Sequence, residues 1–106
     1  MSLENIQKDV DEWCSQFDPP YFNALKQLDK LREETEEVGE ILEKVCGTNK
    51  EEYENYKKDL GGELADVLFV VACIANREKI NLQKEWKIMM KERRYGRDNN
   101  RFKRKQ

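Results

Sequence analysis

The stretch from Leu64 to Ala75 constrains the fold of this chain more than any other. Asp66 is its only charged residue, whereas 40% of the whole sequence is Asp, Glu, Lys or Arg. At about 100° per residue, its apolar side chains surround nearly the whole helix. Such a helix lies at the centre of a soluble protein or crosses a membrane. Because Asn76 and Arg77 cut the run too short for a bilayer, we expect a central helix over 62–78 and no membrane contact.

Two amphipathic helices are predicted ahead of the central one. Apolar residues at helical spacing indicate the first over 3–16, with Ser2 as its N-cap. The second is expected over about 21–46, because Asp18 suits an N-cap and the prolines after it suit a first helical turn. Gly47 suits the left-handed position that ends a helix.

The rest of the chain is predicted to add one short connection and one more helix. Residues 48–51 can form a capping box of Thr48 and Glu51, and the polar segment 50–60 is interpreted as a short helical connection. The glycine pair 61–62 is expected to give either a break in the helix or a close approach of another segment before the central helix. Asn81 is the expected cap of a last helix from Leu82 to about Arg94.

These elements predict one all-α domain over 1–106, a four-helix-bundle-like fold whose second and third helices are antiparallel. A chain this small and polar outside has few ways to enclose a ligand, so we expect a homo-oligomer to complete it. The segment from about 96 to 106 is expected to be an irregular basic tail.

Charge and cysteine content narrow the function. The net charge is only −2, yet residues 91–106 contain eight basic side chains against Glu92 and Asp98. Three cysteines, an odd number at unrelated spacings, argue for reduced thiols in a cytoplasmic protein. Histidine is absent, which excludes Ser/His and Cys/His nucleophiles and imidazole zinc sites.

Carboxylates spaced three residues apart are the candidate site. Glu34 and Glu37 border the apolar stripe of the second helix, and Glu63 and Asp66 open the central helix. Buried charge is costly unless it is paired or bound to metal, and no Lys or Arg lies between residues 61 and 76. Four converging carboxylates would form an oxygen-only site that suits Mg²⁺ first and Mn²⁺ second. The alternative is a solvated helix face, which is the usual role of such runs.

The order of these motifs resembles the MazG-like all-α nucleoside triphosphate pyrophosphohydrolases of the small stand-alone type. The resemblance rests on Glu-x-x-Glu, a spacer, and Glu-x-x-Asp-Val-Leu. It covers most of the chain, and residues 47–60 match least. Further similarity lies in Trp13, Phe17, Tyr21-Phe22, Leu64 to Asn76, Met89 to Lys91, Arg97-Asp98 and Arg101-Phe102.

The resemblance allows two registers for the first motif. The family pattern Glu-Glu-x-Gly-Glu matches Glu36-Glu-Val-Gly-Glu40 literally, and this register would give the metal role to Glu37 and Glu40. Counting from Tyr21 gives Glu34 and Glu37 instead. The helical wheel favours this second register, because Glu40 faces away from the apolar stripe, and Glu40 stays in reserve.

The family resemblance implies hydrolysis of a nucleoside triphosphate between its α and β phosphates, releasing monophosphate and pyrophosphate, often as removal of surplus or non-standard nucleotides. It also implies a homo-oligomer that is a dimer or a tetramer formed as a dimer of dimers. Glu33 or Glu34 is the expected base toward the attacking water. Expected substrate contacts are Lys91, Arg94 and Arg97 for the phosphates, and Trp13, Phe17, Tyr21 and Phe22 for stacking on the base.

Two competing hypotheses remain open from the sequence. One is a non-enzymatic helical module that binds a protein or nucleic acid through the basic tail, although nucleic acid is not the expected partner. The other is a phosphatase or cyclohydrolase-like relative built on the same bundle.

Overall fold

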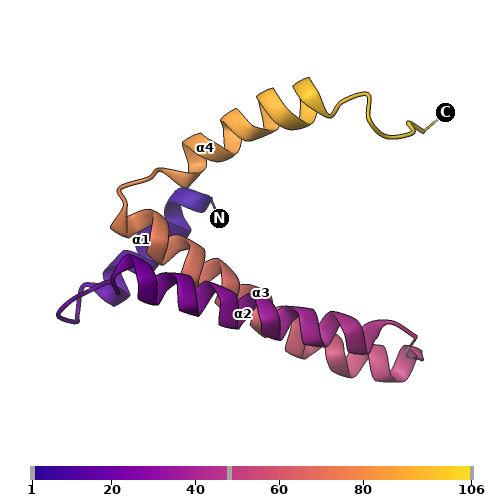
Figure 1. Cartoon of the computed structure of the whole chain (residues 1–106), viewed down its shortest axis with the longest axis horizontal. Helices are drawn as coiled ribbons and strands as arrows, with labels where there is room; N and C mark the ends of the chain where they lie inside the picture. The colour runs from indigo at the N-terminus through magenta and orange to yellow at the C-terminus, as the bar shows by residue number, and fades with distance from the viewer. Residues whose placement is uncertain (1, 48, 106) are drawn as a thin grey trace.

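The computed structural model describes residues 2–47 and 49–105, and these ranges form helices and no strand, which confirms the all-α prediction. In Figure 1, α2 and α3 run antiparallel side by side, α1 packs near one end of this pair, and α4 with η1 leads away from it. The elements are α1 (Leu3–Cys14), α2 (Ala24–Val45), α3 (Lys50–Arg77), α4 (Leu82–Met89) and the π-helix η1 (Met90–Arg97).

Side-chain caps set the helix boundaries. Ser2 Oγ accepts a hydrogen bond from Asn5 N at 3.1 Å, and Asn81 Oδ1 accepts one from Lys84 N at 3.1 Å, so both predicted caps are confirmed. Gly47 has φ +80°, the left-handed conformation predicted for the end of α2.

Two other helix starts differ from prediction. Asn23, not Asp18, caps α2, since Asn23 Oδ1 accepts from Lys26 N at 2.9 Å and the helix begins at Ala24. Asn49 caps α3. The predicted capping box includes Thr48, which lies outside the described residues.

The predicted break at Gly61–Gly62 is wrong, because α3 runs through both glycines as one helix of 28 residues. A glycine inside a helix costs only about 1 kcal/mol relative to alanine. Packing along α2 offsets that cost. The segment 50–60 is therefore the first part of α3, and it extends the antiparallel pair.

The buried core is small and lies where α1 meets α3. Val10 and Cys14 of α1 pack on Ala72 and Cys73 of α3, and Ile6 and Tyr21 cover this cluster. The thiols of Cys14 and Cys73 are free, with Sγ atoms 4.0 Å apart.

The apolar stretch of α3 is covered over only part of its length. Val70, Ala72, Cys73 and Ala75 are buried, whereas Leu64 is 51% exposed and Leu68 and Phe69 are each 38% exposed. The expected helix enclosed on all sides is therefore present only toward the C-terminal end of α3.

A polar network ties α1 to the α3–α4 connection. Asn76 Nδ2 donates to Gln7 O at 2.9 Å and to the Tyr21 hydroxyl at 3.1 Å, and Gln7 Nε2 donates to Asn76 Oδ1 at 2.9 Å. Gln7 Nε2 also donates to Ile80 O, and its Oε1 accepts from Leu82 N, both at 2.8 Å. The network orients Tyr21, which borders the site described below.

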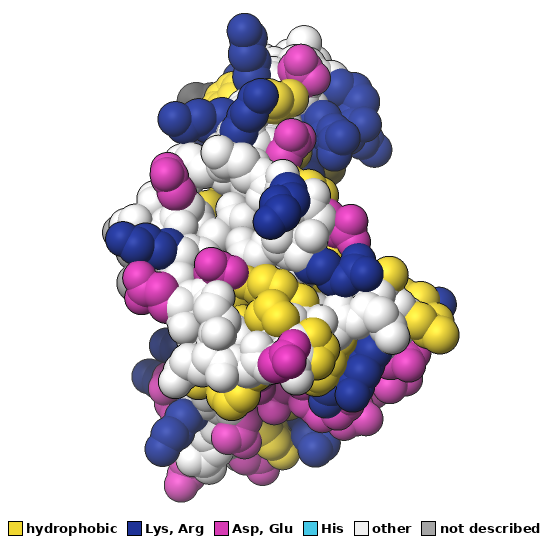
Figure 2. Space-filling model, turned by 90° about the vertical axis from the view of Figure 1, so that its left-hand side faces the viewer, with side chains coloured by type: hydrophobic (Ala, Val, Ile, Leu, Met, Phe, Trp, Pro, Cys, Tyr) yellow, Lys and Arg dark blue, Asp and Glu magenta, His cyan; other side chains and the backbone are white. Residues whose placement is uncertain are grey.

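One acidic side chain, Asp98, binds three arginines of η1 and of the turn that follows it. Asp98, 8% exposed, accepts hydrogen bonds from Arg94 at 2.8 Å, Arg97 at 2.9 Å and Arg101 at 3.3 Å. These guanidinium groups keep the pKa of the Asp98 carboxyl well below its usual range. Figure 2 shows Lys and Arg side chains gathered at the upper end of the molecule, where α4 and η1 lie.

Within the described ranges, every helix is too short or too polar to cross a membrane.

Candidate active site

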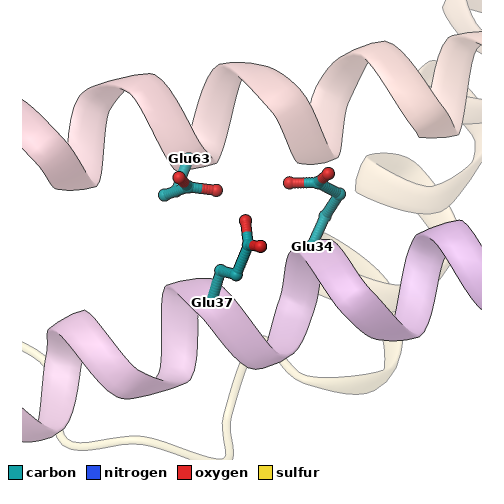
Figure 3. Close-up of side chains that lie close together, drawn as sticks. All are labelled: Glu34, Glu37 and Glu63. Carbon is teal, nitrogen blue, oxygen red and sulfur yellow. The ribbon is translucent and has the colours of Figure 1, made fainter.

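Three glutamates from two helices meet between α2 and α3. One carboxylate oxygen from each of Glu34, Glu37 and Glu63 lies within 4.8 Å of the other two. Figure 3 shows Glu34 and Glu37 rising from α2 toward Glu63, which reaches down from α3. Their spacing explains the arrangement, because residues three apart share one side of a helix and the two helices are antiparallel.

Like charges at this separation are unfavourable without a counter-charge. The Glu34 Oε2 and Glu63 Oε2 atoms are shielded from solvent and accept no hydrogen bond from any residue in the described ranges. The pKa of Glu63 is raised to about 7, first by a hydrogen bond shared with the Glu37 side chain, then by burial and by the neighbouring carboxylates. Burial and the charges of Glu37 and Asp66 raise the pKa of Glu34 as well.

The other predicted acidic residues lie outside this cluster of three. Asp66 is exposed, contrary to the expectation that it would be desolvated, but it lines a pocket together with Glu34 and its charge acts on both Glu34 and Glu63. Glu40 is exposed. Glu33 is also exposed, and its Oε2 lies 3.5 Å from Lys30 Nζ.

The acidic cluster borders a pocket of about 220 Å³ at the junction of α1, α2 and α3. Glu34 and Asp66 form its acidic side, and most of the remaining lining is apolar or aromatic. The lining residues are Trp13, Cys14, Pro20, Tyr21, Phe22, Gln27, Lys30, Glu34, Asp66, Phe69, Val70 and Cys73.

Aromatic rings make one wall of this pocket. Trp13 is 54% exposed and lies between Phe17, with ring centroids 4.9 Å apart, and Phe69, whose ring meets it edge-on at 5.8 Å. Of the four aromatic residues predicted to stack on a base, Trp13, Tyr21 and Phe22 line the pocket, and Phe17 supports Trp13 from outside.

Sequence reasoning missed Gln27, Lys30 and Phe69 as pocket residues. Helical spacing contained the signal, because Lys30 precedes Glu34 by four residues, Gln27 precedes it by seven, and Phe69 follows Asp66 by three. Lys30 is the one cation among the described residues that line the pocket.

The predicted phosphate-binding cations lie on η1, away from the cluster. Figure 1 shows η1 running away from the α2–α3 pair, and Arg94 and Arg97 are hydrogen-bonded to Asp98. Lys91 is exposed on the same helix. Within one chain, these side chains are not brought together with the glutamates.

The donor set fits a hard divalent cation. It contains only carboxylate oxygens, two of which are buried without a partner, and oxygen ligands suit Mg²⁺ and Mn²⁺ better than zinc or copper. A cation would also offset the repulsion that raises the pKa of Glu63.

Comparison with known proteins agrees with this chemistry. The family described as the MazG nucleotide pyrophosphohydrolase domain matches residues 22–102. An uncharacterized protein of Bacillus subtilis, YpjD, is 34% identical over 85 residues, which cover 77% of this chain and 74% of YpjD. No solved structure matches the chain significantly. The chain therefore belongs to the MazG nucleotide pyrophosphohydrolase family.

Proposed function

We propose that this protein hydrolyses nucleoside triphosphates between the α and β phosphates in a Mg²⁺-dependent reaction. The observation that carries the proposal is the convergence of Glu34, Glu37 and Glu63 from two helices beside an aromatic pocket. A nucleotide has the same arrangement, with a flat aromatic base at one end and a multiply charged phosphate chain at the other.

Glu34, Glu37, Glu63 and Asp66 would hold Mg²⁺, with Mn²⁺ as the substitute. The ion would neutralise charge on phosphate oxygens and lower the pKa of a nearby water. Water is added across the α–β phosphoanhydride, and nucleoside monophosphate and pyrophosphate leave. Glu34, which lines the pocket and belongs to the cluster, would accept the proton of that water. The exposed Glu33 lies outside the cluster and pairs with Lys30.

Trp13, Tyr21 and Phe22 would pack against the base, with Phe17 supporting the Trp13 ring. Lys30 enters the proposal as a phosphate contact, because it lines the pocket next to Glu34.

A second copy of the chain is part of the proposal. Lys91, Arg94 and Arg97 can grip outer phosphates only if the η1 of a neighbour reaches the pocket, since their own η1 leads away from it. Leu64 and Leu68 are exposed on α3 and supply apolar surface for contact with a second copy. We expect a dimer or tetramer, measured by light scattering coupled to size-exclusion chromatography.

In a cell, the reaction would remove surplus or non-standard nucleotides, and a cytoplasmic location agrees with the three free cysteines. The base and sugar preferences follow from a substrate screen, which also tests the function.

The deciding experiment measures pyrophosphate release from common and modified nucleoside triphosphates with Mg²⁺. Glu63→Gln and Asp66→Asn should abolish release, and Glu36→Gln, an exposed neighbour on α2, should leave it unchanged. Loss of activity in Glu40→Gln would instead support the Glu37–Glu40 register.

The phosphate product that is released and the binding of nucleic acid distinguish the proposed hydrolase from the two alternative functions. Orthophosphate in place of pyrophosphate would exclude cleavage between the α and β phosphates and favour a phosphatase. Salt-dependent binding of nucleic acid that survives Asp66→Asn, without any pyrophosphate release, would favour the binding module.

A further inference from the structure

Gln27 is a largely buried residue at the pocket, and its amide has no partner among the described residues. Its side chain is 5% exposed and lines the pocket together with Trp13, Phe69 and Glu34. Its carboxamide makes no hydrogen bond with any residue in the described ranges. The shielded side-chain oxygens without a partner in those ranges are Glu34 Oε2 and Glu63 Oε2, so the Gln27 amide is not sealed off from the pocket that it lines. The amide is therefore available to a ligand in the pocket.

The surroundings of Gln27 offer hydrocarbon on both sides. Gln27 stands between the substrate pocket and a second hollow, whose lining around Gln27 is Ala24, Leu28, Leu31 and Ile74. The remaining two residues of that hollow, Arg77 and Glu78, form an ion pair with each other. On the pocket side, the charged lining is Lys30 and the acidic pair Glu34 and Asp66, and the Tyr21 hydroxyl is already bonded to Asn76 and Asp11.

We propose that Gln27 is a substrate-binding residue that hydrogen-bonds the edge of the nucleobase held in this pocket. The inference rests on the proposed function and identifies what reads the base. A base packed beside Trp13 would carry hydrogen-bonding groups into an apolar pocket, where the Gln27 amide and the base edge satisfy each other. Glutamine is suited to this, because its amide presents one acceptor and two donors side by side.

The lack of any fixed partner has a consequence for selectivity. Nothing in the described residues holds the Gln27 amide in one orientation, so Oε1 and Nε2 can exchange places by rotation of the amide. A rotating amide accepts bases whose donor and acceptor occur in either order. Gln27 therefore selects for a base with a hydrogen-bonding edge and tolerates several bases.

Two variants of the full-length protein test this assignment. In Gln27→Leu, kcat/KM for each of the four common deoxynucleoside triphosphates should fall about 5- to 150-fold, mainly through KM, because a base edge would be left unpaired. The inhibition constant of inorganic triphosphate, which has no base, should not change. Thermal melting checks that the variant is folded.

The second variant, Gln27→Glu, keeps the side-chain shape and replaces the amide donor with a carboxylate. Guanine presents two adjacent donors, N1–H and N2–H, so the ratio of kcat/KM for guanine to that for adenine should rise at least about fivefold. The added negative charge acts on every triphosphate alike and cancels in this ratio.

These results distinguish failure of the Gln27 assignment from failure of the proposed function on which it rests. Equal changes for all four nucleotides and for inorganic triphosphate, or an unchanged guanine-to-adenine ratio in Gln27→Glu, would show that Gln27 only packs the core and would overturn the inference. If the unmodified protein releases no pyrophosphate from any nucleotide, the proposed function fails first, and the role of Gln27 falls with it.

Discussion

Binding of Mg²⁺ should displace a proton from Glu63, and the number of protons released can be worked out from the site. The pKa of Glu63 is about 7, because Glu37 shares a hydrogen bond with it and three carboxylates crowd it. At that pKa the metal-free side chain carries about 0.9 proton at pH 6 and about 0.1 at pH 8. Carboxylates bind cations in the ionised form. Mg²⁺ should therefore release nearly one proton at pH 6 and almost none at pH 8.

Isothermal titration calorimetry of metal-free protein with MgCl₂ measures this number. Heats are compared at each pH in two buffers of different ionisation enthalpy, and their difference gives the protons released. Glu63→Gln should remove most of the release at pH 6, and Glu36→Gln should preserve it. A buffer-independent heat of binding at pH 6 would refute the argument that crowded carboxylates hold a proton until the cation arrives.

Protonation of Glu63 should also make the stability of the metal-free protein depend on pH. Glu63 has a pKa of about 7 in the folded chain against an ordinary value of 4.5, so the folded state binds more protons between these limits. Stability should therefore fall as the pH rises from about 4.5 to 7, as followed by thermal melting. Glu63→Gln should flatten this part of the profile.

Three further predictions concern the scaffold. Asn76→Leu removes three hydrogen bonds and should cost about 2–4 kcal/mol, lowering Tm by roughly 10 °C or more in thermal melting; exposed Asn99→Leu is the control. Gly47→Ala should destabilise by about 1 kcal/mol in urea unfolding because φ is +80°, whereas Gly39→Ala, inside α2 with nothing within 4 Å, should be neutral or stabilising. Asp98→Asn should raise hydrogen exchange in η1 at least tenfold and leave α2 and α3 unchanged, since three arginines lose their counter-charge. Equal exchange of the η1 amides in Asp98→Asn and in the unmodified protein would contradict the anchoring role of Asp98.

Helical periodicity was sufficient to place the glutamates of α2. Glu34 and Glu37 border the apolar stripe of that helix, and the structure turns both toward α3. The face of a long helix follows from residue spacing alone, because every turn repeats the same angle. Antiparallel pairing of α2 with α3 followed from the order of the helices, which predicted that Glu63 would lie opposite.

Helix ends and breaks were less predictable, because several residues compete for each one. Asp18 and Asn23 are both good N-caps, and the structure uses Asn23. Tyr21, which lies between the two, is bonded to Asn76 of α3, a contact between distant segments that local spacing does not predict. Gly61–Gly62 would end an isolated helix. In this chain, packing against α2 carries α3 through them, as tertiary contacts commonly override local propensity.

The burial of α3 shows what composition can and cannot establish. Apolar residues from Leu64 to Ala75 indicate surface that some partner must cover, and a sequence does not distinguish cover by the same chain from cover by another copy. Here the chain covers Val70 to Ala75 and leaves Leu64, Leu68 and the adjoining Asp66 open. The uncovered half is also the half that carries the acidic site. Leu64 and Leu68 share one side of α3, and Asp66 lies on the opposite side, because residues two apart differ by about 200° around a helix. A neighbour that buries the two leucines would therefore leave Asp66 open to the pocket that it lines with Glu34.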